Sequence, residues 1–536
     1  MAIKSHYLKP IVIIATILLL LLTIPFLILT KESIVALALY SNLALDHTIL
    51  TLLKNSFNLV ITTVVLSGII AITLAWVTTY YDLPYKKLIN ILILLPLTIP
   101  SYILASTYAY IGEDQIPYFC DTVLNTNCNF SIRTPLGASI IFSLGLYPYL
   151  YLLTKNYFEK LKERITLAKL HGLKERQIIF KIAIPGSKPA IIAGLSLIAM
   201  EVMADFGLAS LFGIKTFTTQ IYRAWFYQNQ YETAAFLSIC LLAIVIIILL
   251  IEKFLNLHKS YTIPKYGATS STAKKPKFIK TIFLLSICLT IPLFAFFIPF
   301  TQILLWGIEK HHYFLSQDFI KTFSNSLFLA LMGSITIVAA TILIITVLKT
   351  YQLKIGKILG NVVSLGYAVP GSVIAISVIY TLQSIFNQFG INYQSISILA
   401  IIGLIYAYFV RFVTLAHNNI QSSWAKIPNE LNDISLIYQK NNLQRLNNIY
   451  IPFLSYEISI SLLLIAVEII KELPATLILR PFNFDTLSTR TYLLASDEMV
   501  STAGALSLSI IAINLIPIYF INKFFLKNHS KIGSNE

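Results

Sequence analysis

Charged residues are scarce in this sequence. Only 12% of its 536 residues are charged, whereas 57% are hydrophobic. In an ordinary soluble domain about a quarter of the residues carry charge. This scarcity excludes such a domain and indicates a chain that lies largely within lipid.

Nucleotide-binding and catalytic motifs are absent as well. The sequence contains no G-x-x-x-x-G-K-[ST], no H-E-x-x-H and no Cys/His group with metal-ligand spacing. Without a P-loop the chain lacks the glycine-rich turn and the lysine that hold nucleotide phosphates. We therefore expect no enzymatic activity and no cofactor bound by this chain. The energy for any active transport would come from a partner that uses ATP.

Cysteine is rare, with four residues in the whole chain. Cys240 and Cys288 fall in apolar segments and are expected to pack there. Cys120 and Cys128 fall in one polar loop, where an oxidising compartment would allow them to pair. Their spacing leaves both a disulfide and two free thiols open.

Long apolar runs recur along the whole chain. A run of about 18 residues or more spans a bilayer core as a helix, and within lipid only a helix satisfies its own backbone polar groups. The sequence therefore predicts an all-α membrane protein with about twelve transmembrane helices, and the first run is too long for a signal peptide. The predicted spans are 10–30, 57–79, 89–110, 136–154, 189–210, 233–251, 281–306, 323–348, 359–385, 395–415, 456–479 and 501–522.

The formal net charge of +16 is unevenly distributed. The stretch 155–188 holds nine basic residues against three acidic ones, and 252–280 holds seven against one. Basic loops stay on the cytoplasmic side of a membrane. This topology, with both termini in the cytoplasm, accounts for the basicity. Membrane lipid is therefore the expected surrounding, and no nucleic-acid partner is expected.

Short sequence matches recur between the two halves of the chain. Asn55–Ser56 opens one predicted span and Asn325–Ser326 another. The loop prolines Pro185 and Pro452 are separated by nearly the same interval. Their common order and spacing predict an internal repeat.

The repeat divides the chain into two halves of six spans each. Residues 1–258 form the first transmembrane domain, 259–277 a cytoplasmic linker and 278–536 the second transmembrane domain. An even number of spans gives both halves the same orientation, so we expect parallel repeats around a shared pore.

Each half carries two acids at the end of its fifth span. Glu201 and Asp205 in the first half correspond to Glu468 and Glu472 in the second. On a continuous helix, residues four apart share one face. Intramembrane acids are functional candidates, so these four form a candidate translocation path. Their distance from the cytoplasmic prolines also suits helix capping, or packing near the outer loop, where they would face a partner outside the membrane.

Pro100 and Pro370 interrupt the third and ninth predicted spans. A proline within a span frees a backbone carbonyl and bends the helix. Both a hinge and a simple packing kink fit this position.

The largest cytoplasmic loop of the first half reads "ERITLAKLHGLKERQIIFKIAIP", from Glu163 to Pro185. Ile165, Ala168 and Gly172 recur with helical spacing and form a small apolar face. Such a face suits docking of a partner protein, or a helix that folds back on its own bundle.

This loop resembles the E-A-A-x3-G-x9-I-x-L-P motif of ABC importer permeases. The matching positions are Thr166, Ala168, Gly172, Ile182 and Pro185 in the first half, and Asp433, Ser435, Gln439, Ile449 and Pro452 in the second. In that family the motif inserts into a cleft of the ATPase subunit and transmits its movement. The resemblance therefore implies two ATPase-coupling loops, and the motif glycine is replaced by Gln439 in the second.

Longer stretches narrow the resemblance to fused ferric-iron ABC importer permeases. They are "LPLTIPSYILASTYAYIG", "MEVMADFGLASLFGIKTFTTQIYRAWF" and "ELPATLILRPFNFDTLSTR". The resemblance implies a multi-pass protein of the bacterial inner membrane that works with an ATP-binding subunit dimer and a periplasmic or extracytoplasmic solute-binding protein. Charged residues of the outer loops would receive the binding protein: Lys215, Arg223, Arg480, Asp485 and Arg490.

Ferric iron is a hard cation that prefers oxygen donors, so the four carboxylates suit it chemically. Thiamine permeases share the fused layout, so thiamine or another small solute is an alternative cargo. An ion-coupled secondary transporter would use the acids but gives no role to the two loops. The sequence contains no catalytic motif that would support a membrane-embedded enzyme.

Overall fold

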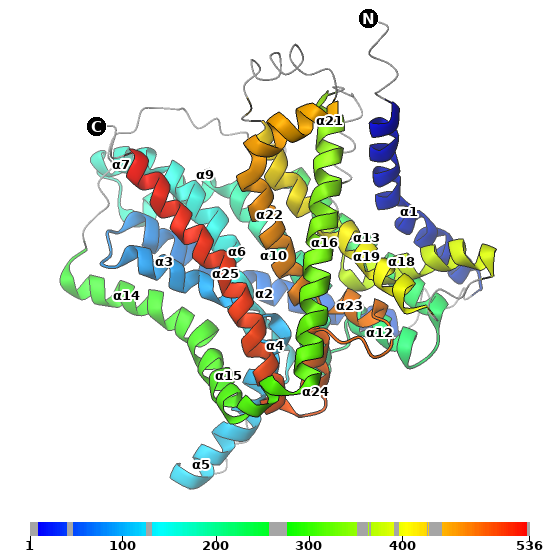
Figure 1. Cartoon of the computed structure of the whole chain (residues 1–536). Helices are drawn as coiled ribbons and strands as arrows, with labels where there is room; N and C mark the ends of the chain where they lie inside the picture. Colours follow the sequence, from blue (N-terminus) through cyan, green and yellow to red (C-terminus); the bar gives the residue numbers. More distant parts are fainter. Residues whose placement is uncertain are drawn as a thin grey trace, which may run out of the picture. The chain divides into compact units, whose positions relative to one another are not determined.

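The computed structural model describes residues 9–39, 47–124, 131–256, 276–350, 363, 366–390, 396–425, 427 and 442–532. Within these residues the chain forms helices joined by turns, and no β-strand occurs (Figure 1). The fold is therefore helical, as predicted. The chain divides into two compact units, each assembled from separate segments of the sequence.

Unit 1 comprises the described parts of 1–44, 220–242 and 315–490. Long helices build it, and short helical turns interrupt them. Its elements are α1 (Lys9–Leu39), α16 (Gln317–Thr350), η8 (Gly366–Ala368), α18 (Gly371–Phe386), η9 (Asn387–Phe389), α19 (Ser397–Trp424), α21 (Asn442–Arg445), η11 (Leu446–Tyr450), α22 (Ile451–Lys471) and α23 (Pro474–Leu479).

Unit 2 comprises the described parts of 45–219, 243–314 and 491–536. Its elements are α2 (His47–Tyr80), α3 (Lys86–Leu94), η3 (Leu95–Thr98), α4 (Ser101–Tyr110), η4 (Ile111–Gln115), α5 (Ile116–Leu124), α6 (Pro135–Lys160), α7 (Lys162–Leu170), α8 (Glu175–Ile178), η5 (Ile179–Ala183), α9 (Ile184–Gly186), α10 (Lys188–Ala204), α11 (Gly207–Leu211), α14 (Phe278–Pro292), η6 (Leu293–Phe297), α15 (Ile298–Glu309) and α25 (Val500–Ile532). Four elements contribute residues to both units: α12 (Phe217–Phe226), α13 (Tyr231–Asn256), η7 (His311–Leu315) and α24 (Leu487–Ser496).

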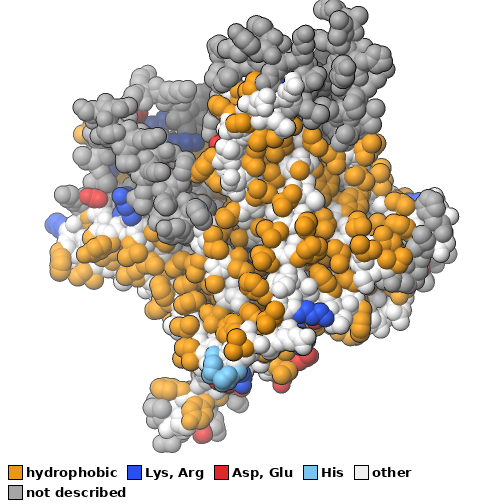
Figure 2. All heavy atoms as spheres, in the orientation of Figure 1, with side chains coloured by type: hydrophobic (Ala, Val, Ile, Leu, Met, Phe, Trp, Pro, Cys, Tyr) orange, Lys and Arg blue, Asp and Glu red, His pale blue; other side chains and the backbone are white. Residues whose placement is uncertain are grey.

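Eight of the described helices are long and apolar enough to cross a membrane, or ten if each of two bent helix pairs is one span. The described residues thus support a multi-pass membrane protein without reaching the predicted twelve spans. Exposed apolar side chains recur at every fourth position along α2, at Phe57, Ile61, Val65 and Ile69. A stripe with this spacing lies on one side of a helix and suits contact with lipid. Apolar side chains also cover much of the described surface visible in Figure 2.

The two units interleave the halves of the sequence. In unit 1, α1 packs against α16 and α18, which come from the second half of the chain. In unit 2, α14 packs against α3, and α15 packs against α4. The first helix of each half therefore lies in the unit built mainly by the other half. The predicted domain boundaries at 258 and 278 stay a prediction, since the two compact units are defined by packing and divide the chain elsewhere.

Helix breaks occur at both prolines predicted to interrupt spans. The 3₁₀ turn η3 ends at Thr98, α4 begins after Pro100, and the chain bends by 89° between the flanking segments. In unit 1, η8 likewise ends just before Pro370, and α18 follows it. A proline nitrogen cannot donate a hydrogen bond, which leaves a carbonyl without its helical partner. The side chain of Asn514 donates to the Thr98 carbonyl over 2.8 Å and so stabilises the first break.

Close helix contact in unit 2 depends on Gly194 of α10. A Cβ atom at this position would lie 2.5 Å from Leu150 Cδ1 and 3.1 Å from Leu150 Cα on α6. Side chains near this position therefore have little space. Gly68 of α2 differs, because a Cβ there would meet Leu195 at an ordinary 3.5 Å.

We predict that Gly194→Ala lowers the stability of the protein by about 1–3 kcal/mol through overpacking. Gly68→Ala is the matched control, because both changes give the same gain in helix propensity but only one creates a clash. Thermal unfolding in detergent, followed by intrinsic fluorescence, measures both variants. Equal midpoints for the two would contradict the role assigned to Gly194.

Candidate functional site

The first predicted coupling loop forms α7, a turn and α8. Ile165 and Ala168 are buried, at 4% and 6% exposure, so this face of α7 folds back on unit 2. This burial fits the alternative of a helix that folds back on its own bundle, and docking of a partner on the same loop stays a prediction. The opposite side of α7 exposes Leu167 at 55% and Leu170 at 78%.

Gly172 ends α7 in the left-handed conformation, with φ of +75°. The Gly172 N–H donates to the Lys169 carbonyl over 3.0 Å, and the Leu173 N–H donates to the Ala168 carbonyl over 3.1 Å. Glycine adopts this conformation without the steric cost that other residues pay, and such a turn satisfies the last carbonyls of a helix. The Thr166 hydroxyl bonds back to the Lys162 carbonyl over 2.9 Å, so it supports α7.

Glu175 anchors the start of α8 to two other helices of unit 2. Its carboxylate accepts hydrogen bonds from the hydroxyl of Tyr81, the residue after α2, and over 3.4 Å from the indole of Trp76 on α2. Lys280 of α14 pairs with the same carboxylate over 3.1 Å. A displacement of α8 would therefore be transmitted to α2 and α14.

Both I-x-I-P sequences contain a wide helical turn. The π-helical turn η5 comes just before Ile184 and Pro185, and η11 comes just before Ile451 and Pro452. The proline nitrogen has no hydrogen to donate, which accounts for the widened turn. Both prolines are exposed, and the matching isoleucines Ile182 and Ile449 are half-buried. Asp433, Ser435 and Gln439 lie outside the described residues.

In each half the helix of the fifth span ends between its two acids. α10 ends at Ala204 and α22 ends at Lys471, so Asp205 and Glu472 are the first extended residues after their helices. The prediction of a continuous helix through both acids was therefore wrong, because each helix ends just before its second acid. Glu201 and Glu468 remain on the helices and are partly exposed.

Asp205 and Glu472 cap the short helices that follow them. Asp205 Oδ1 accepts a hydrogen bond from the Leu208 N–H over 2.9 Å, and the Ser101 hydroxyl donates to its other oxygen. Glu472 accepts hydrogen bonds from the Ala475 and Thr476 N–H groups over 3.1 and 2.9 Å. A side-chain oxygen in this position satisfies the free N–H groups of a helix start.

The backbone carbonyls of these two acids are held in the same way. The Thr218 hydroxyl donates to the Asp205 carbonyl over 2.6 Å, and the Ser488 hydroxyl donates to the Glu472 carbonyl over 2.7 Å. Nearby, the Asn55 amide donates to the Lys215 carbonyl over 3.1 Å. Its counterpart in the second half, Asn325, donates to the Asp485 carbonyl over 3.0 Å. Both halves therefore close their fifth spans with the same hydrogen bonds.

The second half adds a buried cation. Arg411 of α19 pairs with Glu472, its Nη1 lying 3.5 Å from Glu472 Oε1, and Glu472 is 4% exposed. A Cβ at Gly371 would lie 2.4 Å from both atoms, so the pair needs a glycine there. In the first half a neutral serine, Ser101, meets Asp205 instead, and no described lysine or arginine pairs with that acid.

Most of the other charged residues predicted to contact cargo or a binding protein form ion pairs with neighbouring side chains. Glu468 pairs with Lys471 over 2.7 Å, Arg480 with Asp485, and Arg490 with Asp318 over 3.0 Å. Two predicted contacts for a binding protein, Lys215 and Arg223, are exposed. Three histidine, cysteine or acidic side chains arranged to hold a metal are not found in the described part of the chain.

Cys120 is disulfide-bonded, whereas Cys240 and Cys288 are free. Cys128, the predicted partner of Cys120, lies outside the described residues. Their pairing therefore stays a prediction.

Sequence reasoning missed Arg411 and Gly371. A lone arginine inside an apolar run was a usable signal, because a charge within a span needs a partner. Gly371 gave no signal of its own, since only the folded structure brings α18, α19 and Glu472 together.

We predict that Glu472→Gln lowers stability by about 3–5 kcal/mol, because it leaves the Arg411 charge buried and unpaired. Asp205→Asn is the matched change in the other half. It costs at most about 1 kcal/mol, since asparagine also caps helices well and no cation loses its partner. Thermal unfolding in detergent measures both.

Adding Arg411→Met to Glu472→Gln should recover most of the loss. This double substitution tests the ion pair separately from the cap. A double variant no more stable than Glu472→Gln alone would show that the pair is not the cause.

Two comparisons with known proteins give matches. Residues 69–259 match the family described as "Binding-protein-dependent transport system inner membrane component". The Fe(3+)-transport system permease protein FbpB 2 of Haemophilus influenzae is 24% identical over 454 residues, which cover 82% of this chain and 83% of that relative. No solved structure gives a significant match. Residues 69–259 thus match a family of inner membrane components of binding-protein-dependent transport systems, and most of the chain is similar to an iron permease.

Proposed function

We propose that this permease imports ferric iron. The observation that carries the proposal is the similarity over 454 residues to a relative named as an Fe(3+)-transport permease. The exposed leucines of α7 and the exposed I-x-I-P prolines support coupling to a separate ATPase. A periplasmic solute-binding protein would deliver the cargo at the outer ends of the helices.

The proposed architecture is twelve spans in two parallel six-span repeats, with both termini in the cytoplasm. The recurrence of the same cap, hydroxyl and asparagine hydrogen bonds at corresponding positions of the two halves supports the repeat. One fused chain would thus supply both halves of the translocation path, and an ATPase dimer would contact both coupling loops.

The proposed path uses the acids at the ends of the fifth spans. Glu201 and Glu468 are partly exposed and offer hard oxygen donors to a ferric ion. Asp205 and Glu472 hold the following segments by capping, which fixes where each fifth span ends. We therefore assign the contact with iron to Glu201 and Glu468, and the shape of the path to Asp205 and Glu472.

Uptake of radiolabelled ferric iron tests the function. Cells would express the chain with its binding protein and ATPase subunit, and a second strain would carry an ATPase unable to hydrolyse ATP. We expect accumulation in the first strain and background uptake in the second. Full uptake with the inactive ATPase would overturn the importer proposal, whereas ATP-dependent uptake of a different solute alone would overturn only the cargo.

We predict that Leu170→Glu disrupts binding of the ATPase subunit. Leu170 is 78% exposed on the cytoplasmic segment, and a charge there would have to be buried at an interface without a partner. The loss should be on the order of tenfold or more in affinity, measured by co-purification and by stimulated ATP hydrolysis. Leu315→Glu, at 82% exposure in the outer loop, is the control and should leave both unchanged.

We further predict that replacing Glu201 and Glu468 by glutamine lowers iron uptake at least about tenfold at normal protein levels, because a neutral amide binds a hard cation weakly. Asp114→Asn removes an exposed acid from the outer loop and serves as the control. Unchanged uptake in the doubly substituted protein would remove both glutamates from the path.

A further inference from the structure

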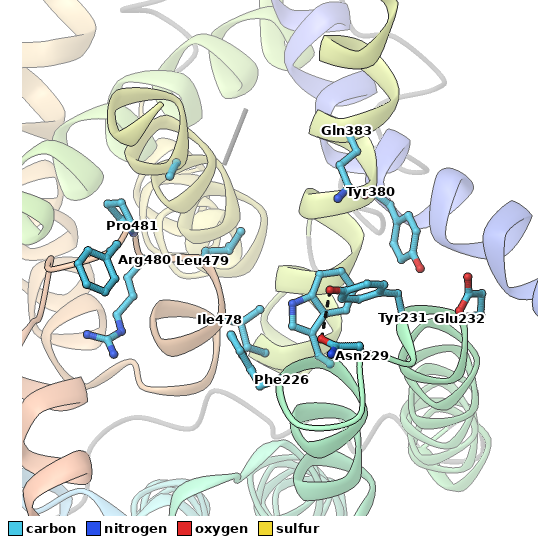
Figure 3. A pocket seen from close by; sticks show the side chains of 13 residues that line it. Phe226, Asn229, Tyr231, Glu232, Tyr380, Gln383, Ile478, Leu479, Arg480 and Pro481 are labelled. Carbon is cyan, nitrogen blue, oxygen red and sulfur yellow. Dashed lines mark hydrogen bonds between the residues drawn. The ribbon is translucent and has the colours of Figure 1, made fainter. Parts of the chain in front are cut away.

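Unit 1 contains a pocket of about 560 Å³ that no step of transport described above uses. Its walls come from the end of α12 and the start of α13, from α18 and α19, and from the chain between Ile478 and Phe482 (Figure 3). Phe482 on its rim is fully exposed. All of these residues belong to the same compact unit.

Three aromatic rings form one end of the pocket. The Trp225 ring lies edge-on to Tyr231, with centroids 4.7 Å apart, and edge-on to Tyr380, with centroids 6.1 Å apart. Trp225 is only 6% exposed and holds the two tyrosines in place. Aromatic faces carry negative charge density and attract cations, most strongly ammonium groups.

Two carboxylates reinforce this attraction. Glu232 lines the pocket, and Glu32 lies on α1, which packs against α18, the helix that carries Tyr380. In the described part of the chain neither glutamate forms an ion pair, and no lysine or arginine lies over the three rings. Arg480, at the opposite end of the pocket, is already paired with Asp485. The aromatic end is therefore both acidic and without a cation of its own.

The position of the pocket indicates where its ligand comes from. Tyr231 is the first residue of α13, a strongly apolar helix that qualifies as a membrane span. Tyr227 and Phe226 beside it are exposed. Exposed aromatic residues at the end of a span lie at the depth of lipid headgroups.

We propose that this pocket binds an organic ammonium group, held by the faces of Tyr231 and Tyr380 and balanced by Glu232 and Glu32. The depth of the pocket favours the headgroup of a zwitterionic phospholipid as the source. A small soluble amine offers the same chemistry. Binding of either is independent of the cargo and of ATP.

Titration of the purified full-length chain with choline tests the chemistry. Trp225 is one of only four tryptophans, so occupancy should change the intrinsic fluorescence in a saturable way. Trp225→Phe should remove most of that change and thereby locate it. Glu232→Gln should raise the half-saturating concentration up to about fivefold, in keeping with the usual strength of an exposed ion pair.

Two further comparisons exclude indirect effects. Glu309→Gln changes an exposed acid elsewhere, which pairs with Lys310 over 3.1 Å, and should leave the titration unchanged. Tyr380→Phe keeps the aromatic face and should retain binding, whereas Tyr380→Leu should lose it. A fluorescence response that does not saturate, or one that Glu232→Gln leaves unchanged, would overturn the proposal.

Lipid retention distinguishes the two sources. Native mass spectrometry would compare phosphatidylethanolamine with phosphatidylglycerol on the wild type and on Glu232→Gln. Retention of phosphatidylethanolamine that depends on Glu232 supports a lipid headgroup. A saturable choline response without that preference supports a soluble amine. If choline gives no response and the two lipids are retained equally, the pocket does not bind ammonium groups.

Discussion

The ends of the two fifth spans depend on one constraint: a helix that stops in apolar surroundings leaves backbone groups that must be satisfied by protein. Asp205 and Glu472 each contribute two kinds of hydrogen bond at these helix ends. The side chain of each acid caps the short helix that follows it. The backbone carbonyl of each acid accepts a hydrogen bond from a hydroxyl group on the next helix, α12 or α24. One residue thereby fixes three consecutive segments. Because a buried unsatisfied polar group costs about 1–3 kcal/mol, these contacts determine the local path of the chain.

The same constraint explains why the two halves differ in chemistry while sharing geometry. Asp205 meets Ser101, a neutral donor, but Glu472 meets the guanidinium of Arg411. A buried ion pair adds little net stability, yet each of its charges requires the other. The pair also requires Gly371, because any side chain there would occupy the space of both charged groups. Three positions on α18, α19 and the end of α22 are therefore mutually dependent in the second half alone.

Much of this arrangement was accessible from the sequence, for identifiable reasons. Apolar runs predicted the helical membrane fold, and the recurrence of Asn55 at Asn325 located groups that make the same hydrogen bond in both halves. The apolar pattern did not show that a helix ends between Glu201 and Asp205. The sequence also did not show which face of α7 is buried, because Ile165 on the buried face and Leu167 on the exposed face are both apolar residues. Contacts between distant segments, such as α1 with α18, leave no trace in local periodicity.

Exposed apolar side chains occur both on uncharged helix stripes and within basic segments, and the two settings indicate contact with lipid and with a partner protein respectively. Along α2 they form a stripe without charges between Phe57 and Ile69, which suits lipid. On α7, Leu167 and Leu170 are neighbours in sequence of Arg164 and Lys169, and Lys174 follows the helix; this basic composition favours a position in water. Apolar side chains exposed to water within a basic segment are stabilised when a partner covers them. Since Glu175, just beyond them, is tied to α2 and α14, a partner docked on α7 would act directly on membrane helices.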